Sequence, residues 1–168
     1  FWFARWGRSI WPVSSPVVAE GLVYAIGGRG GHPGLVVDPD GSGDVSKTHV
    51  MWSIGPASEG LSSPVAWGEY VFRLNSPNLL RCSRIAEGDE LFKERLEGVN
   101  PSVSPIVDPD GRIYFASAGK TVVIQAGEGL KVLARSDLGD PSLATAAVSG
   151  GKIFLKGGEY LYAIGFPK

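Results

Sequence analysis

Acidic side chains with the spacing of a calcium loop occur in one glycine-rich segment. Asp38, Asp40 and Asp44 lie within residues 38–44, and a glycine occupies the sixth position of that segment. Oxygen ligands at alternate positions, with a glycine where the chain turns sharply, allow a loop to wrap around Ca²⁺. The twelfth position holds His49 instead of a bidentate glutamate, and a turn between strands favours the same residues. We therefore expect a turn, with the three aspartates as candidate ligands of a less favoured calcium site.

A second glycine-rich segment, Gly27-Gly28-Arg29-Gly30-Gly31-His32-Pro33, has the composition of a phosphate cradle. Exposed backbone N–H groups bind phosphate in such loops, and Arg29 would add charge. The phosphate-binding loops of nucleotide enzymes precede a helix N-terminus, however, and the residues after this segment are typical of a strand. We expect a connecting loop, with Arg29 and His32 as candidate contacts to a partner.

The residues available for nucleophilic catalysis are few. Cys82 is the only cysteine, which excludes an internal disulfide, and it lies in an apolar strand pattern. His32 and His49 are the only side chains whose ordinary pKa lies near neutrality, and neither has a recognisable triad partner. We expect Cys82 to be a packing residue and the chain to have no catalytic residues of its own.

The N-terminus combines aromatic and basic residues. Such a composition suits a platform that stacks single-stranded nucleic acid, or a buried strand from a preceding repeat. The segment contains Phe1, Trp2, Phe3, Trp6 and Trp11, interleaved with Arg5 and Arg8. The whole chain has 16 Lys+Arg against 17 Asp+Glu, so no basic groove accompanies the aromatics. We expect a strand and no nucleic-acid partner.

The elements that position these residues are short strands. The chain contains 24 Gly and 12 Pro, spaced between runs rich in Val, Ile, Tyr and Phe. Four segments superpose on a Ser-Pro-Val-like start, at Pro16, Pro64, Pro105 and Ala146, and they are 48, 41 and 41 residues apart. This spacing is close to the period of about 40–50 residues that propeller blades show. No apolar run approaches the roughly 18 residues that span a bilayer, so we expect no membrane insertion.

The repeats predict an all-β fold: a β-propeller of about four four-stranded antiparallel blades, the last incomplete. The predicted blades cover residues 13–56, 61–98, 102–139 and 143–165, and residues 1–12 are expected to form a strand of a preceding blade or a closing strand. Residues 87–96 contain good helix formers, but the repeat register predicts the outer strand of the second blade there.

The repeat unit Ser-Ser-Pro-Val, followed by Gly-x-Val-Tyr and a leucine-containing third strand, resembles the PQQ-binding-like β-propeller repeat proteins, which include BamB-like assembly factors. Gly27–Gly31, Gly41–Trp52 and Leu161–Gly165 resemble one bacterial subgroup of that family. The resemblance implies a parent ring of about seven or eight blades, with further blades outside this chain. It also implies a bacterial, extracytoplasmic protein in the periplasm or cell envelope.

The family's docking pattern couples an Ala, an Asp, a Gly and a Trp across neighbouring blades. In the second blade these positions hold Cys82, Arg84, Gly88 and Phe92. In the third blade Ala126-Gly127 is followed by Leu130 and Val132, with neither the Asp nor the Trp, so we expect docking there to rely on general apolar packing.

Two functions follow from the resemblance. The first is a non-catalytic scaffold whose loop face binds a protein or another polymer, with Arg29, His32, Trp67 and Arg73 as candidate loop contacts. The alternative is a fragment of a PQQ- and calcium-dependent dehydrogenase whose catalytic residues lie outside this chain. No acidic ligand set for PQQ and calcium can be placed here, so no cofactor is expected.

Overall fold

The computed structural model describes residues 1–5, 13–27, 34–54, 61–117 and 119–165, and every regular element among them is a β-strand. The all-β prediction is therefore confirmed. Within the described residues no helix is long and apolar enough to cross a membrane.

Four antiparallel sheets follow one another along the chain. The first contains β2 (Val17–Ala19), β3 (Leu22–Ile26), β4 (Gly34–Val37) and β6 (Val50–Ile54). The second contains β7 (Val65–Trp67), β8 (Tyr70–Asn75), β9 (Leu79–Arg84) and β10 (Glu90–Arg95). The third contains β11 (Ile106–Val107), β12 (Arg112–Ala116), β13 (Lys120–Gln125) and β14 (Lys131–Asp137). The fourth, with three strands in the described residues, contains β15 (Ala147–Ser149), β16 (Lys152–Lys156) and β17 (Leu161–Ile164).

Each sheet is a meander, because each strand pairs with the next strand of the same sheet along the chain. The turn between the first two strands of each sheet contains glycine at positive φ, as at Gly21 (75°) and Gly68 (55°). A Cβ atom disfavours this conformation, so the glycines let the chain reverse within a few residues.

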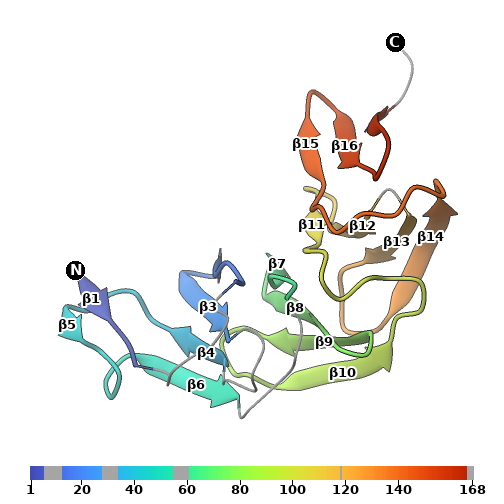
Figure 1. Ribbon diagram of the computed structural model, residues 1–168. Coiled ribbons are helices and arrows are strands. Elements are labelled where there is room, and N and C mark those ends of the chain that lie inside the picture. The colour runs from blue at the N-terminus through green and yellow to red at the C-terminus, as the bar shows by residue number, and fades with distance from the viewer. Residues whose placement is uncertain (6–12, 28–33, 55–60, 118, 166–168) are drawn as a thin grey trace.

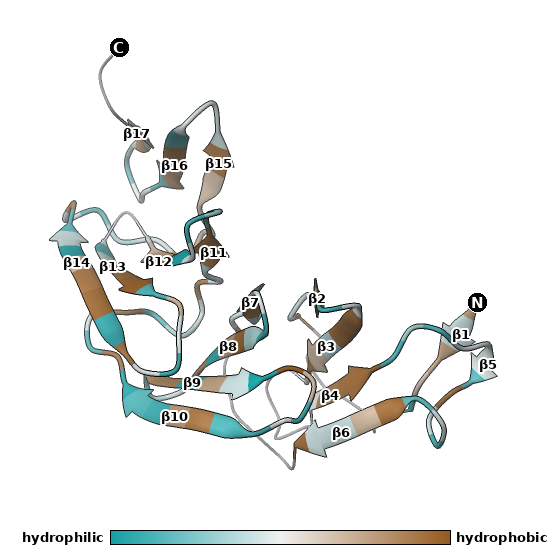
Figure 2. Cartoon of the chain, turned by 180° about the vertical axis from the view of Figure 1, so that it is seen from behind, coloured by the Kyte–Doolittle hydropathy of each residue, from teal (hydrophilic) through white to brown (hydrophobic). Residues whose placement is uncertain are grey.

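The sheets stand side by side in an open arc, with the N-terminus at one end and the C-terminus at the other (Figure 1). Figure 2 shows mainly hydrophobic residues on β3 and β4, whereas the outer strand β10 is largely hydrophilic. This arrangement and the four meanders are those of consecutive propeller blades.

The hydrophobic core consists of separate clusters between neighbouring sheets. Tyr24 and Val36 of the first sheet pack against Val71 and Ile85 of the second. Phe72, Leu80 and Cys82 of the second sheet pack against residues of the third that include Ile113 and Ile124. A smaller cluster joins the third and fourth sheets through Ala116, Ala146 and Leu155. Neighbouring sheets therefore bury the faces that they turn toward each other, as stacked repeats do.

The strand predicted within residues 87–96 is confirmed. Glu90–Arg95 form β10, which pairs with β9 despite a bulge between Glu90 and Phe92. Phe92 and Leu96 pack in the cluster between the second and third sheets. Tertiary packing therefore outweighs the helix propensity of this segment.

The N-terminal segment lies on the outer face of the first sheet. Trp2–Phe3 form β1, which pairs in parallel with β5 (Gly43–Asp44) in the loop between β4 and β6. Trp2 and Ala4 pack against a buried cluster that contains Leu35, Val37 and Val45. Trp6 and Trp11 lie outside the described residues.

Candidate functional site

The acidic loop uses its carboxylates to hold its own turns. Asp38 Oδ1 accepts a hydrogen bond from the backbone N–H of Asp40 at 2.9 Å, and Asp44 Oδ1 accepts one from the N–H of Ser46 at 3.1 Å. The bonds from Ser46 lower the pKa of Asp44. His49 Nε2 lies 3.1 Å from the carbonyl oxygen of Asp40. In the described part of the chain, no group of three or more His, Cys, Asp or Glu side chains is arranged to hold a metal ion.

The candidate partner contacts fall in three places. Arg29 and His32 lie outside the described residues. Arg73 was expected in a loop, and that placement is wrong, because β8 continues to Asn75 and encloses it. Arg73 is 8% exposed, and its Nη2 lies 3.8 Å from Glu90 Oε2.

Trp67 also lies on a strand, at the end of β7, and not in a loop as expected. Its indole covers the first turn of the third sheet, since a Cβ built on Gly111 would lie 2.7 Å from the ring. Its Nε1 is 3.5 Å from the carbonyl oxygen of Pro109. In this position Trp67 helps to dock two neighbouring sheets.

Trp52 docks the first sheet on the second. Its Nε1–H donates to the carbonyl oxygen of Ile85 at 2.8 Å, and its ring lies beside Tyr24 with centroids 5.7 Å apart. Gly88 has φ +81°, and a Cβ there would lie 2.7 Å from the Trp52 ring. The glycine and the tryptophan of the docking pattern therefore meet across this seam.

The seam between the second and third sheets combines apolar packing with polar contacts. Cys82 is fully buried, its Sγ lies 3.6 Å from the carbonyl oxygen of Gly127, and burial raises its pKa to about 12. The thiol is therefore protonated at neutral pH and unsuited to nucleophilic attack. Arg84 crosses the same seam to form an ion pair with Glu128.

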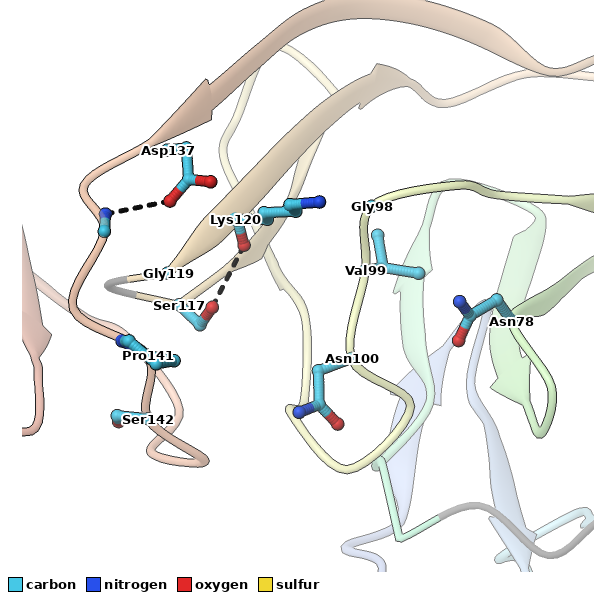
Figure 3. Close-up of a pocket in the computed structure, with 11 residues that line it drawn as sticks. Asn78, Gly98, Val99, Asn100, Ser117, Gly119, Lys120, Asp137, Pro141 and Ser142 are labelled. Carbon is cyan, nitrogen blue, oxygen red and sulfur yellow. Dashed lines mark hydrogen bonds between the residues drawn. The ribbon is translucent and has the colours of Figure 1, made fainter.

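A polar groove opens at one end of this seam (Figure 3). Its cavity volume is about 520 Å³. Four connections line it, and they leave the same end of the second and third sheets: β8–β9, β10–β11, β12–β13 and β14–β15. They contribute Asn78, Asn100, Ser117, Lys120, Asp137 and Ser142.

The side chains of the groove offer donors and acceptors for hydrogen bonds. Ser117 Oγ donates to the carbonyl oxygen of Lys120 at 3.0 Å, and Asp137 Oδ1 accepts from the N–H of Gly139 at 2.8 Å. These two hydrogen bonds stabilise the β12–β13 and β14–β15 connections that line the groove. Asn78 and Asn100 contribute amides, and Lys120 contributes an ammonium that belongs to no ion pair among the described residues.

A second hollow of about 540 Å³ adjoins the groove and shares Gly98, Lys120 and Asp137 with it. Its own lining includes Arg135, which donates to the carbonyl oxygen of Glu97. The linings of the two hollows together contain both charged and neutral polar groups.

None of the groove residues is among the candidate site residues that the sequence pattern predicted. The β8–β9 and β12–β13 connections correspond to the loop around Arg29, because all three join the second and third strands of a repeat. Aligning these connections would have identified Asn78 and Ser117. Asn100 and Asp137 lie in or beside connections between sheets, where the repeats differ in sequence, so the alignment would not have found them.

No family model matches the chain, and no curated protein matches it. Among solved structures it is similar to BamB from Moraxella catarrhalis, with 12% identity and a TM-score of 0.70 over 91% of this chain and 46% of that one. It is also similar to the computationally designed Ika4 protein, with 8% identity and a TM-score of 0.64 over 99% and 97% of the two chains. A europium-containing methanol dehydrogenase aligns at 10% identity and a TM-score of 0.48 over 77% and 27%.

The four sheets are therefore β-propeller blades with a fold similar to that of BamB, and the propeller fold that the repeats predicted is confirmed. The matched part of this chain spans about half the length of BamB.

Proposed function

We propose that the chain is a non-catalytic binding scaffold that holds an extended segment of a partner protein in the groove between its second and third sheets. The supporting observation is the groove itself, an opening between the second and third sheets that is lined by amides, hydroxyls and backbone groups. An extended polypeptide exposes one donor and one acceptor per residue, which such a lining can satisfy.

The charged residues of the groove favour a partner segment with particular charges. The Lys120 ammonium attracts a carboxylate, and Asp137 beside it attracts a cation, so a partner segment with both charges fits better than a uniformly charged one. The proposal includes an extracytoplasmic location, as the family resemblance implies.

Binding of displayed peptides tests the proposal. A library of random peptides would be selected on the immobilised chain, and the affinity of the selected peptides would be measured by fluorescence anisotropy. We expect Asn100→Ala and Lys120→Ala to weaken binding about tenfold each, because each removes a polar contact in the groove. Lys93→Ala, on the exposed side of β10, is the matched control and leaves the affinity unchanged.

Two results would contradict the proposal. One is selected peptides whose affinity the groove variants do not change. The other is a saturable rise in melting temperature that requires PQQ and Ca²⁺ together and disappears with EDTA, since that result would support the dehydrogenase alternative.

A further inference from the structure

A carboxylate of the chain itself bridges the third and fourth sheets. Asp140, in the β14–β15 connection, accepts hydrogen bonds from the backbone N–H groups of Gly158 at 2.8 Å, Glu159 at 3.1 Å and Tyr160 at 3.1 Å. The Tyr162 hydroxyl donates to the same carboxylate at 3.0 Å. The turn between β16 and β17 is therefore a donor site that one carboxylate group occupies.

The groove between the second and third sheets is built from the same two parts. The connections that precede the third and fourth sheets differ in sequence until Asn100 and Asp140, each of which is followed by Pro and Ser. The β12–β13 connection, residues 117–120, corresponds to residues 157–160 between β16 and β17. Both parts are offset by 40 residues from their counterparts. Since Asn100 and the β12–β13 connection both line the groove, the groove lies where the Asp140 carboxylate lies in the next seam.

The strands that flank the two turns match in register. Phe115 pairs with Val122 in the third sheet, and Leu155 pairs with Tyr162 in the fourth. In each sheet these paired side chains pack in the cluster shared with the preceding sheet. The backbone N–H groups of the β12–β13 turn therefore point toward the groove, as those of the β16–β17 turn point toward Asp140.

The carboxylate that this turn would bind is replaced by an amide. Asn100 stands in the place of Asp140, and its Oδ1 accepts a hydrogen bond from the N–H of Ser102 at 2.9 Å. Figure 3 shows Asn100 on one wall of the groove, with Gly119 and Lys120 on the opposite wall. In the part of the chain that the structure describes, no side-chain oxygen accepts a hydrogen bond from the N–H of Gly119 or Lys120. These donors can therefore bind a ligand.

The side chains add a positive charge at the same turn. Lys120 stands in the place of Tyr160, so its ammonium lies beside the turn's N–H groups. Val122 stands in the place of Tyr162 and supplies no hydroxyl, and the ammonium is the donor that can replace it. Asp137 is the cross-strand neighbour of Lys120, and its Oδ1 already accepts a hydrogen bond from a backbone N–H. A carboxylate at the turn would thus receive charge-assisted hydrogen bonds.

We infer that the groove binds a carboxylate of the partner segment through the N–H groups of Gly119 and Lys120, the Lys120 ammonium and the Asn100 amide, in the way that the next seam binds Asp140. A C-terminus and an acidic side chain offer the same group, and the experiments below distinguish them. The inference rests on the proposed function, because it names the chemical group by which the partner segment is held.

Nuclear magnetic resonance of the isotope-labelled chain tests the site without a peptide. Sodium acetate is titrated, and sodium chloride at the same ionic strength is the salt control. We expect saturable shifts of the Gly119 and Lys120 amide signals with acetate alone. The amides of Gly158 and Glu159 are the internal control and should not shift, because Asp140 already occupies that turn. Shifts at both turns, or at neither, would overturn the inference.

The peptides selected by display identify the source of the carboxylate. Each peptide is synthesised with a free C-terminus, with a C-terminal amide, and with asparagine or glutamine in place of its acidic residues. We expect one of the two changes to weaken binding about tenfold, because it removes charge-assisted hydrogen bonds. A loss on amidation identifies the C-terminus, and a loss on replacement of an acidic residue identifies a side chain.

The peptide results separate this inference from the proposed function. Peptides that bind equally well in every form, yet are weakened by the groove variants, would overturn the inference and leave the proposed function standing. If no peptide is selected at all, the proposed function is contradicted, and with it the assignment of the carboxylate to a partner segment.

Asn100→Asp tests the equivalence with Asp140. The new carboxylate should bind the β12–β13 turn itself, so we expect the affinity for the acidic peptide to fall about tenfold or more and the melting temperature to rise. Asn78→Asp, in the β8–β9 connection of the same groove, adds the same charge and is the control that does not raise the melting temperature. An Asn100→Asp variant that binds the peptide as tightly as the parent, or that is not stabilised, would overturn the inference.

Discussion

At the scale of single residues, glycines and polar caps hold the ends of strands where neighbouring sheets approach. Gly88 leaves the space that the Trp52 indole fills. The Asp140 carboxylate accepts hydrogen bonds from backbone N–H groups of the turn between β16 and β17. Substitutions at both positions act on docking or turn geometry without removing a large hydrophobic side chain.

Gly88→Ala is expected to lower the free energy of unfolding by about 2–5 kcal/mol, because it adds a clash with Trp52 to the cost of a positive φ. Gly68→Ala is the matched control: Gly68 has φ +55°, and a Cβ built there would have no atom within 4 Å, so only the conformational cost of about 1–2 kcal/mol is expected. Urea unfolding measures both. An equal loss of unfolding free energy in the two variants would show that the packing of the Trp52 indole does not require a glycine at position 88.

Asp140 is expected to make the fourth sheet sensitive to acid. Partial desolvation raises the pKa of this carboxyl, but hydrogen bonds from the backbone N–H groups of Tyr160, Glu159 and Gly158 and from the Tyr162 hydroxyl outweigh it, and the pKa is lowered. The stabilisation is therefore present above the pKa of an unfolded aspartate and is lost as the pH falls through the lowered value.

Thermal unfolding as a function of pH tests this effect. Asp140→Asn is expected to melt at a lower temperature than the parent at neutral pH, and the difference should shrink on acidification. A difference that stays constant down to the lowest pH would contradict a role for the ionised carboxylate.

At the scale of elements, the hydrophobic clusters between neighbouring sheets stabilise the fold. Phe72→Ala is expected to cost about 3–5 kcal/mol, because Phe72 is 1% exposed in the largest cluster and its removal leaves a cavity. Leu133→Ala on the exposed face of β14 should cost about 0.5 kcal/mol. Chemical denaturation compares the two. A small loss for Phe72→Ala would mean that the sheets do not depend on this seam.

Strand positions followed from the sequence where apolar runs alternate with glycine turns. The prediction succeeded for β10, whose composition favours helix, because the repeat register fixed its place in the meander. It failed for Arg73 and Trp67, since a charged or aromatic residue near a strand end does not reveal how far the hydrogen-bonded ladder continues.

At the scale of the whole molecule, the four sheets follow one another in an open arc (Figure 1). Each pair of neighbouring sheets shares a hydrophobic cluster, so the stability of one sheet depends on the sheet beside it.

The sequence by itself determined the repeat, the all-β class and the order of strands, because a blade is built from local hairpins whose turns and alternation are visible within one period. It also placed Cys82 in a packed strand, from its apolar neighbours.

Only the tertiary structure decided which residues meet across a seam. The contact between Trp52 and Gly88, the ion pair between Arg84 and Glu128 and the groove around Lys120 each join different sheets. Such contacts depend on the stagger between sheets, which one period of sequence does not encode. The physical reason is that strand pairing depends on local register, whereas seams and grooves depend on how whole sheets pack.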